Sequence, residues 1–196
     1  VSLVAAIPVS NTTKAICFDP QNHYRLVILG ESGIRSVLVN TIDKVLKEIE
    51  TEHSFEHYVF VPSVNELLLA SYGTFLYVIL GDSVVNVSQP LGNKPISALR
   101  SVRHFIFIVS ENMIYLYKAN GEAPFLTQIG PIDLNINSVS DFSPSPDGDL
   151  AVVLYDNSFA GLLDVNVAVK LIKQNQQTTE NQSAELDTEQ EDELAN

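Results

Sequence analysis

The triplet Phe-x-Pro recurs along this chain at a nearly constant interval, and this recurrence limits the possible folds more than any other feature. The three Phe residues are 42 and then 82 positions apart, and the second interval is about twice 41. A period of this length is typical of repeat architectures, in which each repeat is one small unit of secondary structure. The period predicts a fourth copy near residue 101, where the triplet is absent but an apolar strand, residues 105–109, follows. The triplets are Phe18-Asp19-Pro20, Phe60-Val61-Pro62 and Phe142-Ser143-Pro144.

The same order of elements follows each Phe: a polar turn, an apolar strand, a turn of small residues and a second strand. Short runs of Val, Ile, Leu and aromatic residues bounded by Gly, Asn, Asp and Pro are typical of strands. We expect strand pairs at residues 26–29 with 34–39, 67–70 with 75–80, 105–109 with 114–117, and 150–154 with 159–163. A further, outer strand is expected after each pair, at residues 45–49, 84–87, 125–129 and 167–172.

Nearly continuous apolar runs, such as Leu26-Val27-Ile28-Leu29, indicate strands that are buried on both faces. Sheets stacked around an axis bury strands in this way, because each sheet is covered by its neighbours. We therefore predict an all-β fold: residues 1–173 form about four blades of a β-propeller with an incomplete ring, at 12–50, 55–90, 96–130 and 137–172. The rest of the ring is expected in missing sequence or in another chain. A single β-sandwich is the alternative, and the regular period argues against it.

The two ends of the chain differ from the repeats. Residues 174–196 contain seven acidic residues and no basic or aromatic residue, which predicts a disordered acidic tail or linker. A short helix from Ala184 onward is the alternative if a partner supplies a surface. The apolar segment 1–7 is interpreted as a strand and not as a signal peptide, because it has no basic flank.

Charge and composition argue against several kinds of partner. The formal net charge is −13, and the 11 basic residues are scattered, whereas binding to nucleic acid needs clustered Lys and Arg. The nearest cluster, Arg100 and Arg103, is interpreted as a solvated turn. No apolar stretch approaches the roughly 18–20 residues of a membrane span. We thus expect neither nucleic acid nor membrane as a partner.

The single cysteine, Cys17, cannot form an internal disulfide, and this usage is typical of a reducing, intracellular compartment. We expect Cys17 to be a buried core residue. The sequence Asn-x-Ser/Thr occurs at Asn11, Asn86 and Asn181, and in an intracellular protein these are chance matches.

The sequence offers few candidates for chemistry. His53 and His57 are four residues apart, a spacing that could hold zinc on a helix, but they precede a predicted strand and are interpreted as structural. Asp147, Asp149 and Asp156 could form an acid–base pair or a calcium site, although solvated turns explain them more simply. No nucleophile motif is present. The prediction is therefore a protein without catalytic, cofactor-binding or metal-binding residues, which is not an enzyme.

Phosphate-binding glycine loops are also absent from the sequence. Gly30 and Gly33 are the nearest glycine pair, but they join two predicted strands and Glu31 between them would repel phosphate. They are interpreted as a hairpin turn.

The fourth copy resembles a blade of the WD-repeat family. In that family a short strand ending in Phe-Ser-Pro leads through an Asp-Gly turn to an inner pair of strands, as at residues 139–164. The chain contains no Trp, so Leu163-Asp164 takes the place of the Trp-Asp pair that gives the family its name.

Across residues 12–165 the order of motifs is similar to the N-terminal propellers of the WD-repeat cilia- and flagella-associated proteins. The similarity includes Phe18-Asp19-Pro20, residues 55–60, residues 66–70 with Gly73, and residues 142–146. It implies a non-catalytic protein-interaction scaffold in the cytoplasm and cytoskeleton, in the axoneme of cilia or flagella. Its partners would be other proteins, such as axonemal proteins tied to doublet microtubules or dynein regulation, or tubulin. The alternatives are a general cytoplasmic WD-repeat adaptor in another multiprotein complex and, less favoured, a propeller enzyme with catalytic groups in its channel.

Overall fold

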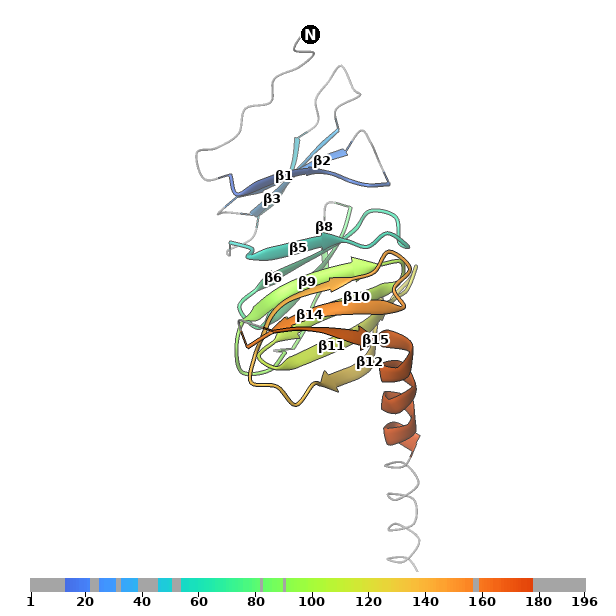
Figure 1. Cartoon of the computed structure of the whole chain (residues 1–196). Coiled ribbons are helices and arrows are strands. Elements are labelled where there is room, and N and C mark those ends of the chain that lie inside the picture. Colours follow the sequence, from blue (N-terminus) through green and yellow to red (C-terminus); the bar gives the residue numbers. More distant parts are fainter. Residues whose placement is uncertain are drawn as a thin grey trace, which may run out of the picture.

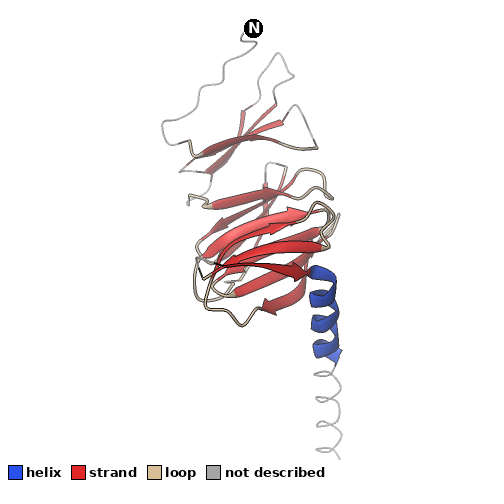
Figure 2. Cartoon of the chain, viewed as in Figure 1, coloured by secondary structure: helices blue, strands red, loops and turns tan. Residues whose placement is uncertain are grey.

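The computed structural model describes residues 13–21, 25–30, 33–38, 46–50, 54–81, 83–89, 91–156 and 159–177. Most of these residues lie in antiparallel strands, and the described part contains one helix, residues 165–177 (Figure 2). The predicted strand pairs all form, with ends within a few residues of the expected ones. The chain has the fold of a WD-repeat-type β-propeller with about four blades of an incomplete ring.

The described strands form four sheets, each a meander of strands that are consecutive in the chain. Blades 1 to 3 have four strands each, and blade 4 has three. Blade 1 contains β1 (Ala15–Phe18), β2 (Arg25–Gly30), β3 (Gly33–Leu38) and β4 (Leu46–Glu50). Blade 2 contains β5 (His57–Phe60), β6 (Leu67–Tyr72), β7 (Phe75–Leu80) and β8 (Ser83–Val87). Blade 3 contains β9 (Ile96–Val102), β10 (Phe105–Ser110), β11 (Met113–Ala119) and β12 (Leu126–Asp133). Blade 4 contains β13 (Val139–Pro144), β14 (Leu150–Tyr155) and β15 (Phe159–Asp164).

The blades are stacked in chain order, with their first strands next to one another (Figure 1). The first strand of blade 3, β9, contacts both β5 of blade 2 and β13 of blade 4. Hydrogen bonds between consecutive blades repeatedly join residues 41 positions apart, as in the Arg100 side chain to Asp141 and the Ser101 side chain to the Phe60 carbonyl. The sequence period is therefore the step from one blade to the next.

Apolar side chains fill the spaces between the blades. Because successive residues of a strand point to opposite faces, each central strand contributes to two interblade layers. In β10, Ile106 and Ile108 pack towards blade 2, while Phe107 and Val109 pack towards blade 4. All four of these side chains are fully buried. The nearly continuous apolar runs thus form strands that are buried on both faces, as predicted.

The expected outer strand at residues 167–172 is wrong, because residues 165–177 form a helix. The carboxylate of Asp164 accepts a hydrogen bond from the Val167 amide at 3.0 Å, which is the geometry of a helix N-cap. Val165 and Ala168 are buried, and Ile172 packs against the same core, so the apolar residues follow a helical spacing. The β-branched residues in this segment favour a strand locally, and tertiary packing overrides that preference.

The helix lies against β12, the outer strand of blade 3 (Figure 1). A Cβ atom at Gly130 would lie 2.6 Å from Ile172 Cγ2, so the close approach requires glycine on the strand. The Gln176 side-chain amide also donates a hydrogen bond to the Ile129 carbonyl at 3.0 Å. Residues 174–177 of the predicted tail therefore belong to the helix, while residues 178–196 and the predicted strand at 1–7 lie outside the described residues.

Candidate interaction surface

The outer edge of blade 4 differs from the same edge of the other blades. In blades 1 to 3 the third strand pairs with a fourth: β3 with β4, β7 with β8, and β11 with β12. Within the described part of the chain, β15 pairs with β14 on one side and with no strand on the other. A strand edge of this kind presents backbone N–H and C=O groups that can pair with another strand.

A groove of about 510 Å³ lies beside this edge, between β15, the end of β12 and the helix. We call it the blade-4 groove. Leu162 of β15 and Val167 and Leu171 of the helix are exposed apolar residues at this groove. Its lining residues are Pro131, Ile132, Asp133, Leu134, Leu162, Leu163, Asp164, Val167, Ala168, Leu171, Ile172 and Asn175.

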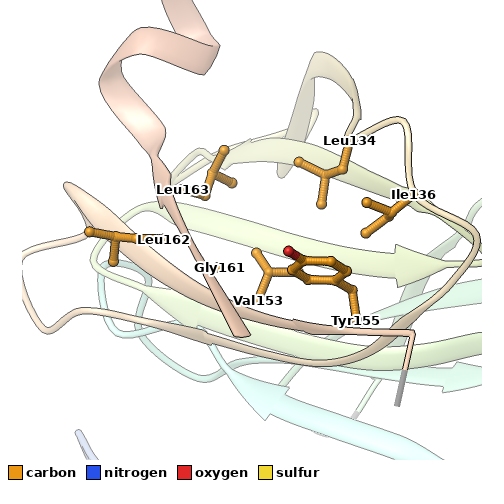
Figure 3. A pocket seen from close by; sticks show the side chains of 7 residues that line it. All are labelled: Leu134, Ile136, Val153, Tyr155, Gly161, Leu162 and Leu163. Atoms are coloured by element: carbon orange, nitrogen blue, oxygen red, sulfur yellow. The ribbon is translucent and has the colours of Figure 1, made fainter. Parts of the chain in front are cut away.

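A second, smaller cavity of about 170 Å³ adjoins the groove and shares Leu134, Leu162 and Leu163 with it. Figure 3 shows its walls: Leu134 comes from the segment that leads into blade 4, and Tyr155 rises from β14 to face it. The two cavities together make a continuous apolar surface at the edge of blade 4.

Two carboxylates, Asp133 and Asp164, lie among the lining residues of the groove. Asp164 caps the helix, and Asp133 accepts a hydrogen bond from the Asn135 amide at 2.8 Å. They give the groove a negative rim on a chain whose net charge is already −13. This rim favours a ligand that carries basic residues beside apolar ones.

The structure does not bring the three candidate aspartates together. Asp147 and Asp149 lie in the turn before β14, whereas Asp156 follows that strand, so about six residues of extended chain separate them. The Asp156 carboxylate accepts a hydrogen bond from the Ser138 amide at 3.1 Å. Hydrogen bonds from the Ser145 hydroxyl and the Asp149 amide hold the pKa of Asp147 below its usual value.

Only one of the two candidate histidines lies among the described residues. His57 begins β5, while His53 lies outside the described residues. Within the part that the structure describes, no group of three or more His, Cys, Asp or Glu side chains is placed to hold a metal ion. Gly30 pairs with Gly33 across a hairpin, as predicted.

The two arginines of the sparse basic cluster occupy different environments. Arg100 lies on β9, not in a turn, and forms an exposed ion pair with Asp141 at 2.8 Å. Arg103 lies in the following turn with a positive φ of 52°. Of the three Asn-x-Ser/Thr sites, Asn86 lies on β8, while Asn11 and Asn181 lie outside the described residues.

Cys17 is half-buried, not fully buried as expected. It packs beside Val27 and Leu29 in the layer between blades 1 and 2, and the Sγ atom donates to the Val27 carbonyl at 3.8 Å. Burial raises the pKa of the Cys17 thiol, although a hydrogen bond with Tyr58 partly opposes this effect. Burial also raises the pKa of the Tyr58 hydroxyl, as does the neighbouring Cys17.

Sequence reasoning did not identify a buried ion pair between Arg25 and Asp19. The Arg25 Nη1 atom lies 3.0 Å from Asp19 Oδ2, and the side chains are only 4% and 2% exposed. The guanidinium also donates to the Glu66 and Gly81 carbonyls of blade 2. Asp19 is the middle residue of the first Phe-x-Pro triplet, so the sequence shows its position in the repeat. The sequence does not show that Arg25 is its partner.

Comparisons with known proteins identify the fold and no sequence family. No family model matches the chain, and no curated protein matches it. Solved structures do match, and they include the Myceliophteria thermophila Cps50 (Swd1) β-propeller domain, with a TM-score of 0.59 and 15% identity over 73% of this chain.

No helix in the described part is both long enough and apolar enough to cross a membrane.

Two further matches show how widely this fold is shared. Kluyveromyces lactis Hsv2 has a TM-score of 0.58 and 17% identity over 83% of this chain. The dihydro-heme d1 dehydrogenase NirN in complex with DHE has a TM-score of 0.68 and 13% identity over 84% of this chain. The chain spans 53% of Cps50, 52% of Hsv2 and 37% of NirN, so its matched part covers about half the length of the first two.

Proposed function

We propose that this protein is a non-catalytic scaffold that binds other proteins, and that the blade-4 groove takes an extended segment of a partner. The observation that carries the proposal is the edge of β15, which pairs with no other described strand and lies beside an apolar groove. In the other three blades a fourth strand occupies this position, so the site has the geometry for an added antiparallel strand. The partner segment would carry apolar residues at alternate positions and a basic residue facing Asp133 or Asp164.

We further propose that the protein works in the axoneme of cilia or flagella, with partners on doublet microtubules or among dynein regulators. The support for this step is the order of sequence motifs described above. The formal net charge of −13 favours a basic protein partner over nucleic acid, whose phosphates are also negatively charged.

Strand addition can be tested with a labelled peptide that carries the β8 sequence, the outer strand of blade 2, between two lysines. Fluorescence anisotropy should show binding to the full chain. Leu171→Asp places a charge in the groove and should weaken binding about tenfold, because the Asp must be desolvated beside the peptide. Val85→Asp is the matched control, since Val85 is also an exposed aliphatic residue but lies on β8 of blade 2.

The contribution of backbone hydrogen bonds to peptide binding is tested with a second peptide. A peptide with proline at its centre lacks one N–H donor and should bind more weakly than the parent peptide. Equal binding of both peptides, or equal loss with Leu171→Asp and Val85→Asp, would contradict strand addition at β15.

The axonemal step is tested by co-sedimentation of the full chain with isolated doublet microtubules that retain their associated proteins. The protein should pellet with these doublets, and Leu171→Asp should reduce the pelleted fraction while Val85→Asp does not. A chain that stays in the supernatant, while still binding the strand peptide, would point to an adaptor in a different complex.

A further inference from the structure

The outward face of blade 4 carries the same kind of surface that the other blades bury against their neighbours. The third residue of the second strand is Val27 in blade 1, Leu69 in blade 2 and Phe107 in blade 3, and each is 0% exposed. Each belongs to the apolar layer between its own blade and the following one. The same position in blade 4 is Val152, which is 49% exposed.

The neighbouring strand shows the same relation. Leu69 pairs with Val78, and Phe107 pairs with Leu116, and both partners are buried in the interblade layer. In blade 4 the corresponding pair is Val152 with Leu162, and Leu162 is 70% exposed. The outward face of blade 4 therefore has the register and side-chain chemistry of an interblade interface, and no described part of the chain supplies its second half.

Blade 1 offers the opposite half of the same interface. Tyr58 and Phe60 on the first strand of blade 2 pack against blade 1. The matching positions of blade 1, Ile16 and Phe18, are 52% and 58% exposed on the outward face. Among the described residues, blade 4 and blade 1 thus present two exposed apolar faces that are complementary in kind and are not two copies of one face.

We propose that two copies of this chain close one ring, with blade 4 of each copy packed on blade 1 of the other. The part of this chain that matches the Cps50 β-propeller domain covers 53% of that domain, so one copy supplies about half of such a fold. Four blades from each copy make eight, and propellers have about four to eight. Each contact joins two different faces, blade 4 of one copy and blade 1 of the other. A two-fold rotation relates the two copies, so both contacts form and the ring has no face left uncovered.

This inference does not depend on the proposed function, because it is tested at Val152 on the broad face of blade 4, which does not line the groove, although Leu162 belongs to both surfaces. Leu171→Asp should therefore leave the assembly intact, while the ring variants below should still bind the strand peptide. Failure of one proposal can be recognised without failure of the other.

The test is the mass of the full chain in solution, measured by light scattering after size-exclusion chromatography. The expected mass is twice the 21.6 kDa of one chain. Val152→Asp and Phe18→Asp should each weaken the dimer about tenfold or more, because each buries an unpaired charge in the contact. Val85→Asp, at a site 42% exposed on β8, should leave the mass unchanged.

Mixing the two variants distinguishes this ring from a symmetric contact. A heterodimer of Val152→Asp with Phe18→Asp has both substitutions in one interface and an unaltered second interface. The mixture should therefore regain a species of two chains that neither variant forms alone at the same concentration. A monomeric wild-type chain, open-ended larger assemblies, or a dimer lost with Val152→Asp but not with Phe18→Asp would overturn the proposal.

Discussion

Arg25 and Asp19 form an ion pair that is buried between the first two blades. Because the pair is buried, loss of one partner should lower the free energy of unfolding far more than at an exposed pair. The guanidinium reaches two carbonyls of blade 2 as well as the carboxylate, so it links the blades as well as neutralising Asp19. Arg25→Met leaves the carboxylate buried without its counter-charge. We expect a loss of about 3–5 kcal/mol in the free energy of unfolding, measured by urea denaturation.

Arg100→Met is the matched control, because Arg100 pairs with Asp141 at 2.8 Å but both side chains are exposed. Exposed ion pairs contribute about 0–1 kcal/mol, so this variant should remain close to the wild type. Equal stability of the two variants would show that the buried pair does not hold blade 1 on blade 2.

Cys17 allows a second test of the same interblade layer. Burial raises the pKa of the thiol, so a smaller fraction is thiolate at a given pH, and the thiolate is the reactive form. Alkylation by iodoacetamide at pH 8 should be slower in the folded protein than in urea. The folded rate should continue to rise with pH above the usual thiol range. A folded rate equal to that in urea would mean that blade 2 does not cover Cys17.

At the scale of elements, the contact between the helix and β12 depends on a glycine. Gly130→Ala would place a Cβ atom 2.6 Å from Ile172 Cγ2, and the helix would have to move away from the strand. We expect a loss of about 1–3 kcal/mol in the free energy of unfolding, as for other overpacked sites, with a reduced helical signal in circular dichroism. Gly121→Ala is the control, because nothing lies within 4 Å of a Cβ atom there, and it should not destabilise the protein.

The strands were predictable from sequence because two independent signals agreed on them: the period and the apolar runs. Residues 75–80 were expected as a strand and β7 is Phe75–Leu80, since a tight turn at Gly73 fixes where it starts. The helix was not predictable in this way. Its β-branched residues favour a strand locally, and the burial of Val165 and Ala168 that selects the helix depends on contacts with distant residues.

The candidate interaction surface could not be predicted from the sequence either, because it also depends on contacts between residues that are distant in the chain. The blade-4 groove joins Pro131 of β12 with Leu171 of the helix, and neither residue belongs to a motif. The groove exists because the chain turns into a helix where the other blades add a strand. Among the acidic candidates that the sequence did suggest, Asp156 lies apart from Asp147 and Asp149 in the described part of the fold.

At the scale of the whole molecule, stability should decrease from the middle of the stack towards its ends. In repeat folds each unit is stabilised mainly by its neighbours, and a terminal unit has only one. β10 is covered on both faces, whereas Leu150, Val152 and Leu154 of β14 are exposed on the outward face. Local unfolding should therefore begin at the open faces and spread inward.

Hydrogen exchange can measure this gradient in the Val152→Asp variant, which we expect to be monomeric. The amides of β10 should exchange most slowly and those of β14 faster, because β10 lies between two blades while blade 4 is packed on blade 3 alone. In the wild-type dimer blade 4 gains a second neighbour, so the β14 amides should become more protected while those of β10 change little. Equal protection of β14 and β10 in the monomer would mean that the blades unfold together, and the open faces would then carry no energetic cost.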